Sequence, residues 1–151
     1  MHRTQPAARM LDTLHMYLDG RLARPPIAEL IGFDLIEAEI GHAVIEFQAE
    51  ARHANPMGTL HGGVLCDIAD AAMGMAYAST LSPGESFTTL ELKINFLRPF
   101  WKGKLRAVGD VIKQGNTVGL VECEVLDEKN RLVAKASSTC MTLKGPQAHG
   151  R

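Results

Sequence analysis

The run Val64-Leu65-Cys66-Asp67-Ile68-Ala69-Asp70-Ala71-Ala72-Met73-Gly74-Met75-Ala76-Tyr77-Ala78 has the composition of a helix and is apolar on nearly every face. A helix that is apolar all round either lies inside a protein or spans a membrane. This one has about 16 residues including two aspartates, whereas a membrane span needs roughly 18 apolar residues. The sequence therefore predicts one long helix buried inside the fold.

Strand-like segments lie on both sides of this helix. Before it, residues 42–49 alternate between apolar and polar side chains and follow a similar segment over residues 33–40. After it come four more segments, over residues 88–97, 105–113, 117–126 and 131–143. In the first of these, strict alternation places Leu90, Leu92, Ile94 and Phe96 on one face and Thr89 on the other.

This order of elements predicts an α+β fold in which a curved antiparallel sheet of about six strands wraps one helix. An open sheet has unpaired edges, and pairing in a dimer would cover them. Leucines at helical spacing in residues 11–22 predict a short helix, and Pro26 begins a second one that Gly32 closes. We expect a helical extension over residues 1–25, a domain over residues 26–144 and a disordered tail over residues 145–151.

Composition narrows the class of protein. The chain has 151 residues, which fits one domain, and its formal net charge of −1 disfavours a generic nucleic-acid binder. It shows no apolar run long enough for a membrane span and no secretory signal. The three cysteines include no CxxC pair, and the histidines show no metal-ligand spacing. We expect a cytoplasmic protein with reduced thiols, no metal and no membrane partner.

Asp70 and Asp67 are the first candidate site residues. Asp70 lies between apolar residues in the middle of the helix, and burial raises the pKa of a carboxyl toward the range of a general base. Asp67 lies three residues earlier, so the two carboxyls share roughly one face and each could raise the pKa of the other. The alternative is structural, with either carboxyl bonded to a loop backbone or facing solvent.

The residues before the helix form a second candidate group. Gly62 and Gly63 leave backbone N–H groups accessible at the helix N-terminus, where an oxyanion could bind. A turn that requires glycine is the alternative. His61 can orient a carbonyl or water, or cap the helix. Asn55 can likewise orient a carbonyl or water, or it can form an Asx turn before Pro56, which is the structural alternative.

Taken together, these residues resemble a known family. The stretch Asn55-Pro56-Met57-Gly58-Thr59-Leu60-His61-Gly62-Gly63-Val64-Leu65, followed by Asp70, resembles the signature of hot-dog-fold acyl-CoA thioesterases, above all the phenylacetate-degradation (PaaI) type. The runs at residues 27–33 and 88–99 resemble that family as well. The resemblance covers residues 26–143 and implies the hot-dog fold and hydrolysis of an acyl-CoA thioester to free acid and CoA.

The resemblance also implies roles for individual residues. Asp70 corresponds to the carboxylate that acts as general base or nucleophile, and Gly62 to the backbone N–H that polarises the thioester carbonyl. His61 and Asn55 correspond to positioning residues, and Thr89 to a hydroxyl near the carboxylate. Asp70 and Thr89 of one subunit would face the other three residues of its partner, in a homodimer or homotetramer. Coenzyme A enters as part of the substrate and no other cofactor is expected. Substrate contacts are expected from Gly63, Leu65, Met73, Phe87 and Arg98.

Two other functions stay open. Hot-dog hydratases and dehydratases use a histidine fourteen residues before an acid, and His53 and Asp67 have that spacing. The Pro-rich stretch that follows the histidine in such enzymes is largely missing here. A non-catalytic acyl-CoA-binding protein is the second alternative. The pattern leaves the acyl group open between aromatic and aliphatic.

Overall fold

The computed structural model describes residues 9–150. Two short helices come first, α1 (Met10–Leu18) and α2 (Pro26–Ile31), and Gly32 ends α2 in the left-handed conformation with φ of 91°. The hairpin of β1 (Phe33–Glu39) and β2 (His42–Ala49) leads through the short 3-10 helix η1 (Ala51–His53) to the long helix α3 (Gly62–Ala78). Four strands follow: β3 (Ser86–Phe96), β4 (Gly103–Gln114), β5 (Val118–Asp127) and β6 (Leu132–Leu143).

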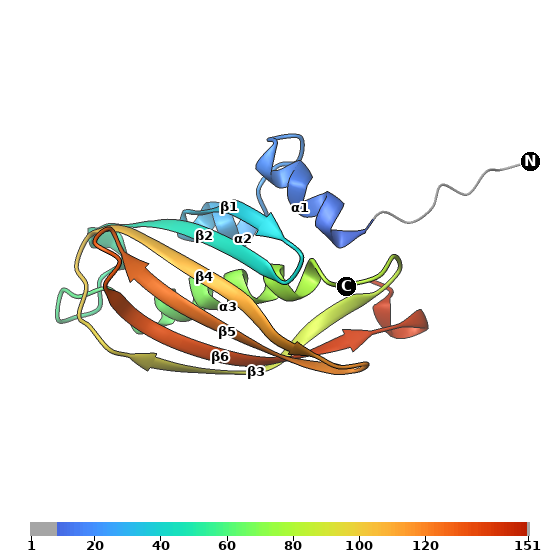
Figure 1. The fold of residues 1–151 in the computed structure, drawn as a ribbon. Coiled ribbons are helices and arrows are strands. Elements are labelled where there is room, and N and C mark those ends of the chain that lie inside the picture. The colour runs from blue at the N-terminus through green and yellow to red at the C-terminus, as the bar shows by residue number, and fades with distance from the viewer. Residues whose placement is uncertain (1–8, 151) are drawn as a thin grey trace, which may run out of the picture.

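The six strands form one sheet in the order β1-β2-β4-β5-β6-β3, and each adjacent pair is antiparallel. Figure 1 shows the sheet curving along α3, with α1 beside β1 at one end. The predicted α+β architecture, one long helix against a curved sheet of six antiparallel strands, is confirmed.

The core lies between α3 and the inner face of the sheet. The alternation in β2 is as predicted, because Ala43, Ile45, Phe47 and Ala49 are at most 1% exposed. Helix and sheet approach most closely at Gly109 of β4. A β-carbon at that position would lie 2.5 Å from the carbonyl oxygen of Ala72, so only glycine allows this packing distance.

Strand β3 differs from the prediction in one respect that matters for the site. Its register against β6 shifts between Thr89 and Glu91, which makes Leu90 an extra, bulged residue that is 52% exposed. Thr89 lies opposite Cys140, and Leu92 lies opposite Ser138. Because Cys140 and Ser138 are two residues apart and share a face, Thr89 is on the inner face together with Leu92. The strict alternation that put Thr89 on the opposite face is wrong.

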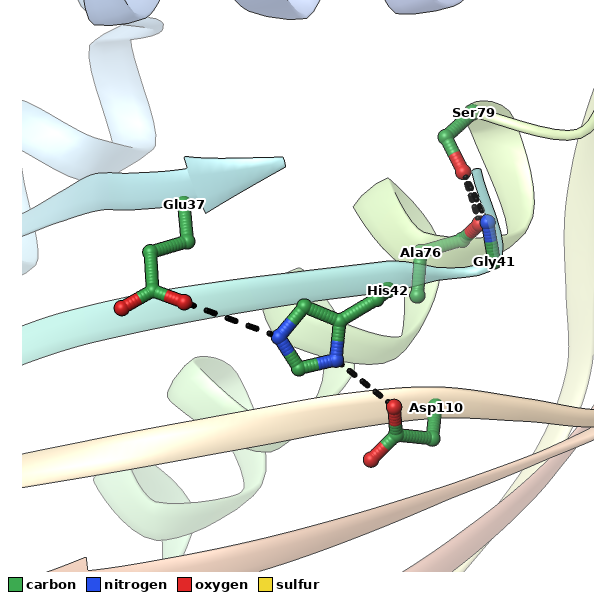
Figure 2. Close-up of polar contacts among 6 residues, drawn as sticks. All are labelled: Glu37, Gly41, His42, Ala76, Ser79 and Asp110. Carbon is green, nitrogen blue, oxygen red and sulfur yellow. Dashed lines mark hydrogen bonds and ion pairs between the residues drawn. The ribbon is translucent and has the colours of Figure 1, made fainter. Parts of the chain in front are cut away.

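Polar contacts fasten the β1–β2 hairpin to the rest of the domain (Figure 2). The Ser79 hydroxyl, just after α3, donates to the carbonyl of Ala76 at 2.6 Å and accepts the N–H of Gly41 at 2.7 Å. On the outer face of the sheet, His42 of β2 lies between two carboxylates. Its Nδ1 is 2.7 Å from Asp110 of β4, and its Nε2 is 3.7 Å from Glu37 of β1.

The chain ends differ in part from expectation. Helix α1 ends at Leu18, so Leu22 lies beyond it, and the part of the extension in residues 1–8 lies outside the described residues. Helix α1 packs against β1 through the buried Leu14 and through His15, whose Nε2 is 3.1 Å from the carbonyl oxygen of Ala38. Part of the tail that was expected to be disordered forms a 3-10 helix, Gly145–Ala148.

Candidate active site

Helix α3 is not enclosed on every side by its own chain. Its buried side faces the sheet and includes Ile68 and Ala69, both 0% exposed. Asp67 and Asp70 lie on the other side and are exposed to solvent. The prediction that Asp70 is buried is therefore wrong for the single chain, because the sheet curves around only part of the helix surface.

The Asp70 carboxylate has one hydrogen-bond donor, the hydroxyl of Thr89, with 3.2 Å between Oγ1 and Oδ1. Asp70 is exposed as a residue, but neighbouring atoms partly bury its carboxylate, which raises its pKa, while the hydrogen bond from Thr89 lowers the pKa. The net direction is upward, toward the range in which a carboxylate accepts protons effectively near neutral pH.

The neighbours of Asp70 on the open face are Asp67 and Cys66. Burial raises the pKa of Asp67, and the negative charge of Asp70 raises it further. Burial also raises the pKa of the Cys66 thiol, with additional contributions from the charges of both aspartates. Because the thiolate is the nucleophilic form of cysteine, this environment opposes nucleophilic catalysis by Cys66.

A groove of about 270 Å³ begins at Asp70 and Thr89 and continues between α3, α2 and the start of β3. Its walls beyond the two polar residues and Asp67 are apolar, and they come mainly from Ile27, Phe33, Ala71, Gly74, Met75 and Phe87. An apolar groove with a few polar groups at one end is typical of a small-molecule site. The carboxylate thus lies at the polar end of an apolar groove.

The N-terminus of α3 has one free backbone donor. His61 is the N-cap residue, and its Nδ1 accepts the N–H of Gly63 at 2.8 Å. This occupies the Gly63 donor, which was expected to be accessible. No hydrogen-bond acceptor is assigned to the Gly62 N–H within residues 9–150. The ring of Phe96 covers Gly62 so closely that a β-carbon there would lie 2.8 Å from its Cζ.

The loop before α3 is shaped by Asn55. Its Oδ1 accepts the N–H groups of Met57 and Thr59, at 2.9 and 3.2 Å, and its Nδ2 donates to the Thr59 hydroxyl at 2.8 Å. The structural alternative, an Asx turn, accounts for both ends of this side chain. Asn55 therefore acts on the site by holding the loop that borders Gly62.

A second cavity, of about 350 Å³, is bordered by Gly62. Leu65 and Arg98 border it, as predicted for substrate contacts, together with Asn55 and the aromatic rings of Phe96 and Phe100. Arg98 is exposed and brings a positive charge to the cavity. This is the only one of the five described cavities that includes Gly62, and Asp70 does not border it.

The structure therefore separates the two halves of the predicted site. Gly62 and Asp70 are eight residues apart in one straight helix, which corresponds to about 12 Å along its axis. A carbonyl oxygen bound at the Gly62 N–H is too far from the Asp70 carboxylate of the same chain for proton transfer through one water.

Two further predicted residues lie elsewhere. Met73 is 0% exposed in the core and borders none of the described cavities, so the prediction of a substrate contact is not supported in this chain. His53 is buried, with Nε2 3.1 Å from the carbonyl oxygen of Ile31 and Nδ1 accepting the N–H of Glu50 at 3.0 Å. Both ring nitrogens are occupied by main-chain groups, so His53 is not free to move protons as a hydratase would require.

Sequence reasoning missed Gly74, Ile27 and Phe33 as parts of the groove. Gly74 carried a signal, because glycine in a helix interior destabilises the helix relative to alanine and suggests a steric reason. Ile27 and Phe33 carried none, because their position depends on how α2 and β1 pack against α3.

In the described residues no three His, Cys, Asp or Glu side chains converge as a metal site. None of the described helices is long and apolar enough to cross a membrane.

Comparison with known proteins identifies the family of this chain. Residues 57–134 match the profile of the Thioesterase superfamily. Acyl-coenzyme A thioesterase PaaI of Escherichia coli K12 is 33% identical over 108 residues, which cover 71% of this chain and 75% of that protein. The 1,4-dihydroxy-2-naphthoyl-CoA hydrolase of Listeria monocytogenes is 28% identical over 118 residues, which cover 78% and 96%. The solved structure of E. coli PaaI superposes with a TM-score of 0.79 at 26% identity, covering 90% of this chain and 97% of that one.

The matched profile spans 78 of the 151 residues, counted from 57 to 134, and includes all of α3 and the strands from β3 to β5. It therefore covers both Gly62 and the Asp70–Thr89 pair. The chain belongs to the thioesterase superfamily and has the hot-dog fold of its PaaI-type members.

Proposed function

We propose that this protein hydrolyses an acyl-CoA thioester to a free acid and CoA, with Asp70 as the essential carboxylate. The observation that carries the proposal is the hydrogen-bonded Asp70–Thr89 pair at the polar end of an apolar groove. The names of two relatives, an acyl-coenzyme A thioesterase and a hydrolase of an aromatic acyl-CoA, support the choice of CoA thioesters as substrates.

In the proposed reaction the acyl group occupies the apolar groove and its thioester carbonyl accepts the N–H of Gly62. The Asp70 carboxylate takes a proton from water, whose oxygen bonds to the carbonyl carbon. Negative charge builds on the carbonyl oxygen, where the N–H of Gly62 and the positive end of α3 stabilise it. The C–S bond then breaks, and the electron pair leaves on the CoA sulfur. Direct attack by Asp70 through an anhydride would use the same ionised carboxylate.

We propose that the complete site forms between two copies of the chain. The 12 Å between Asp70 and Gly62 along α3, estimated from the rise of a helix, prevents one chain from supplying both groups. The open face of α3 carries Asp67 and Asp70 and lies next to β3, an edge strand of the sheet. Two helices packed antiparallel through this face would bring Asp70 of one copy to Gly62 of the other, twice in a symmetric dimer.

The first experiment is CoA release from a panel of acyl-CoAs, followed with a thiol reagent. General-base help contributes about 10²–10⁴-fold, so the folded Asp70→Asn variant should lose activity by that factor. Asp67→Asn is the matched control on the same helix face and should remain active. Under the hydratase alternative, Asp67→Asn would lose activity and Asp70→Asn would not. Tight acyl-CoA binding without CoA release would instead identify a non-catalytic binder.

A second experiment tests whether two copies share a site. Gly62→Pro removes the N–H at the first position of α3, where proline is compatible with a helix. Gly62→Ala keeps the N–H and is the matched control, because in both variants the added β-carbon requires the exposed ring of Phe96 to turn aside. Asp70→Asn and Gly62→Pro chains, each inactive alone, are co-expressed with different tags. Random pairing in a symmetric dimer makes half of the dimers mixed, each with one intact site, so about one quarter of wild-type activity should return. Complete inactivity of purified mixed dimers would contradict a shared site.

A further inference from the structure

The groove next to Asp70 extends along α3 to Gly74 and Phe87. Gly74 lies four residues after Asp70 on α3, so both are on the same helix face about 6 Å apart along the axis. Phe87 lies two residues before Thr89 on β3, on the same strand face. The pair Gly74–Phe87 therefore lines the groove one helical turn beyond the pair Asp70–Thr89.

The Phe87 ring is supported from behind. Its centroid lies 5.7 Å from that of the Tyr77 ring, at an interplanar angle of 56°. Tyr77 is 0% exposed, and its hydroxyl is 2.8 Å from the hydroxyl of Thr142, the residue directly opposite Phe87 on β6. The buried Tyr77 ring, held by Thr142, therefore packs against the ring of Phe87 and limits its movement on that side.

The ring of Phe87 packs against α3 at Gly74. A β-carbon at position 74 would lie 3.3 Å from Cζ of Phe87 and 3.6 Å from Cε2. Glycine inside a helix destabilises it relative to alanine, yet this buried glycine lies in the interior of α3. The absent side chain lets the ring of Phe87 lie against the helix backbone, which lengthens the groove.

We propose that Gly74 and Phe87 form the end wall of the acyl-binding groove and set the maximum length of the acyl chain that the protein accepts. This inference rests on the proposed function, in which the thioester lies at Asp70. Acyl groups that end before the ring bury every methylene in the apolar groove. Longer chains meet Phe87, and their further methylenes stay outside.

The test uses a series of S-alkyl-CoA thioethers with 2 to about 14 carbons, which cannot be hydrolysed, and measures their dissociation constants by titration calorimetry. Each buried methylene should tighten binding about fourfold, and this gain should stop at a definite chain length where the chain reaches Phe87. Binding that does not depend on chain length would overturn the proposal.

We call the chain length at which the gain in affinity stops the break. Two variants should move this break in opposite directions. Phe87→Ala removes the wall, so the fourfold gain per methylene should continue to longer chains. Gly74→Ala places a β-carbon 3.3 Å from Cζ of Phe87, so the ring must shift by a few tenths of an ångström and the break should come at a shorter chain. Phe87→Leu serves if Phe87→Ala does not fold. Leu35→Ala, a half-buried core residue that borders none of the described cavities, is the control and should leave the break unchanged.

Failure of this inference is distinguishable from failure of the proposed function. A break that stays at the same length in both groove variants overturns the end wall, even if wild type releases CoA from short acyl-CoAs. A break that moves as expected supports the end wall even if no acyl-CoA is hydrolysed, a result that would contradict only the catalytic proposal.

Discussion

The hydroxyl of Thr89 on β3 donates a hydrogen bond to the carboxylate of Asp70 on α3 across 3.2 Å, and residues 79–85 connect these two elements. The contact depends on the bulge at Leu90, which turns Thr89 to the inner face of the sheet. The contact between Thr89 and Asp70 thus depends on one extra residue in an edge strand, a position where bulges commonly re-aim side chains.

Replacing Thr89 by valine should change the pH dependence of catalysis. The hydroxyl lowers the pKa of Asp70, so its loss raises this pKa and moves the acid limb of the kcat/KM profile to higher pH. A hydrogen bond of this kind contributes about 0.5–1.5 kcal/mol, which corresponds to about a two- to tenfold loss of kcat/KM below the limb. Thr88→Val, one residue earlier and on the other face of β3, should leave the profile in place. A limb that does not move in Thr89→Val contradicts the assignment of Asp70 as the titrating group.

The Asp70 carboxyl should also make stability depend on pH. Its pKa is higher in the folded protein than in the unfolded chain, so the folded state holds its proton more tightly. Ionisation therefore costs stability, and this cost is absent below the unfolded pKa of about 3.9 and complete above the raised folded pKa. Asp70→Asn removes the cost, so its free energy of unfolding should exceed that of wild type at pH 7.

The measurement is urea unfolding of both proteins between pH 3 and pH 8. The difference between Asp70→Asn and wild type should be close to zero at the acid end and grow as the pH rises. Glu91→Gln, an exposed carboxylate on the outer face of β3, is the control. A variant that is less stable than wild type at neutral pH would make Asp70 a structural residue.

His61 should contribute to stability as the N-cap of α3. Its Nδ1 accepts the N–H of Gly63 at 2.8 Å, and loss of an N-cap costs about 0.5–2 kcal/mol. His61→Ala should lower the free energy of unfolding by that amount. Asparagine is a good N-cap residue, so His61→Asn should restore stability. If catalysis needs only the cap, His61→Asn also restores CoA release, whereas a stable but inactive His61→Asn would show that the imidazole contacts the substrate.

His42 should make the sheet more stable in mild acid. Its hydrogen bond to Asp110 is the largest contribution to a raised pKa, and the charges of Asp110, Glu37 and Glu39 raise the pKa of His42 further against the effect of burial (Figure 2). Stabilisation by the protonated ring is fully present below the unfolded pKa of 6.5 and is lost as the pH rises through the higher folded value.

The expected contribution is that of a surface ion pair, about 0.2–1 kcal/mol, because His42 and its partners are partly exposed. It is measured as the difference in the free energy of unfolding between wild type and His42→Gln at pH 5.5 and pH 8.5. The difference should be larger at pH 5.5. His149→Gln, an exposed histidine near the C-terminus, should show no such trend. An equal difference at both values of pH would mean that the charge on His42 does not fasten β1 to β4.

Several elements of the fold could be predicted from the pattern of neighbouring residues in the sequence. The apolar composition of residues 64–78 predicted α3, and the alternation through Ala43, Ile45 and Phe47 predicted the inner face of β2. Gly32 marked the end of α2 correctly. These features follow from the periods of a helix and a strand and from the backbone freedom of glycine, all of which act over a few neighbouring residues.

The arrangement of the site required the folded chain. An alternating pattern cannot show that Leu90 is an extra residue, because the register of β3 is set by its partner β6. The roles of Asn55 and His53 were ambiguous until their hydrogen bonds to Thr59, Ile31 and Glu50 were known.

For the groove, too, the sequence predicted some features and only the folded structure determined the others. The sequence alone predicted that Asp70 is a carboxylate among apolar helix residues and that Gly62 lies at an accessible helix N-terminus. Both predictions depend only on residues adjacent in the chain. Packing determined that Met73 faces the core while Gly74, the next residue, lies under the ring of Phe87. Successive residues of a helix point about 100° apart. Which of them meets the groove is therefore set by how α3 is rotated against the sheet, a rotation fixed by contacts between residues far apart in the chain.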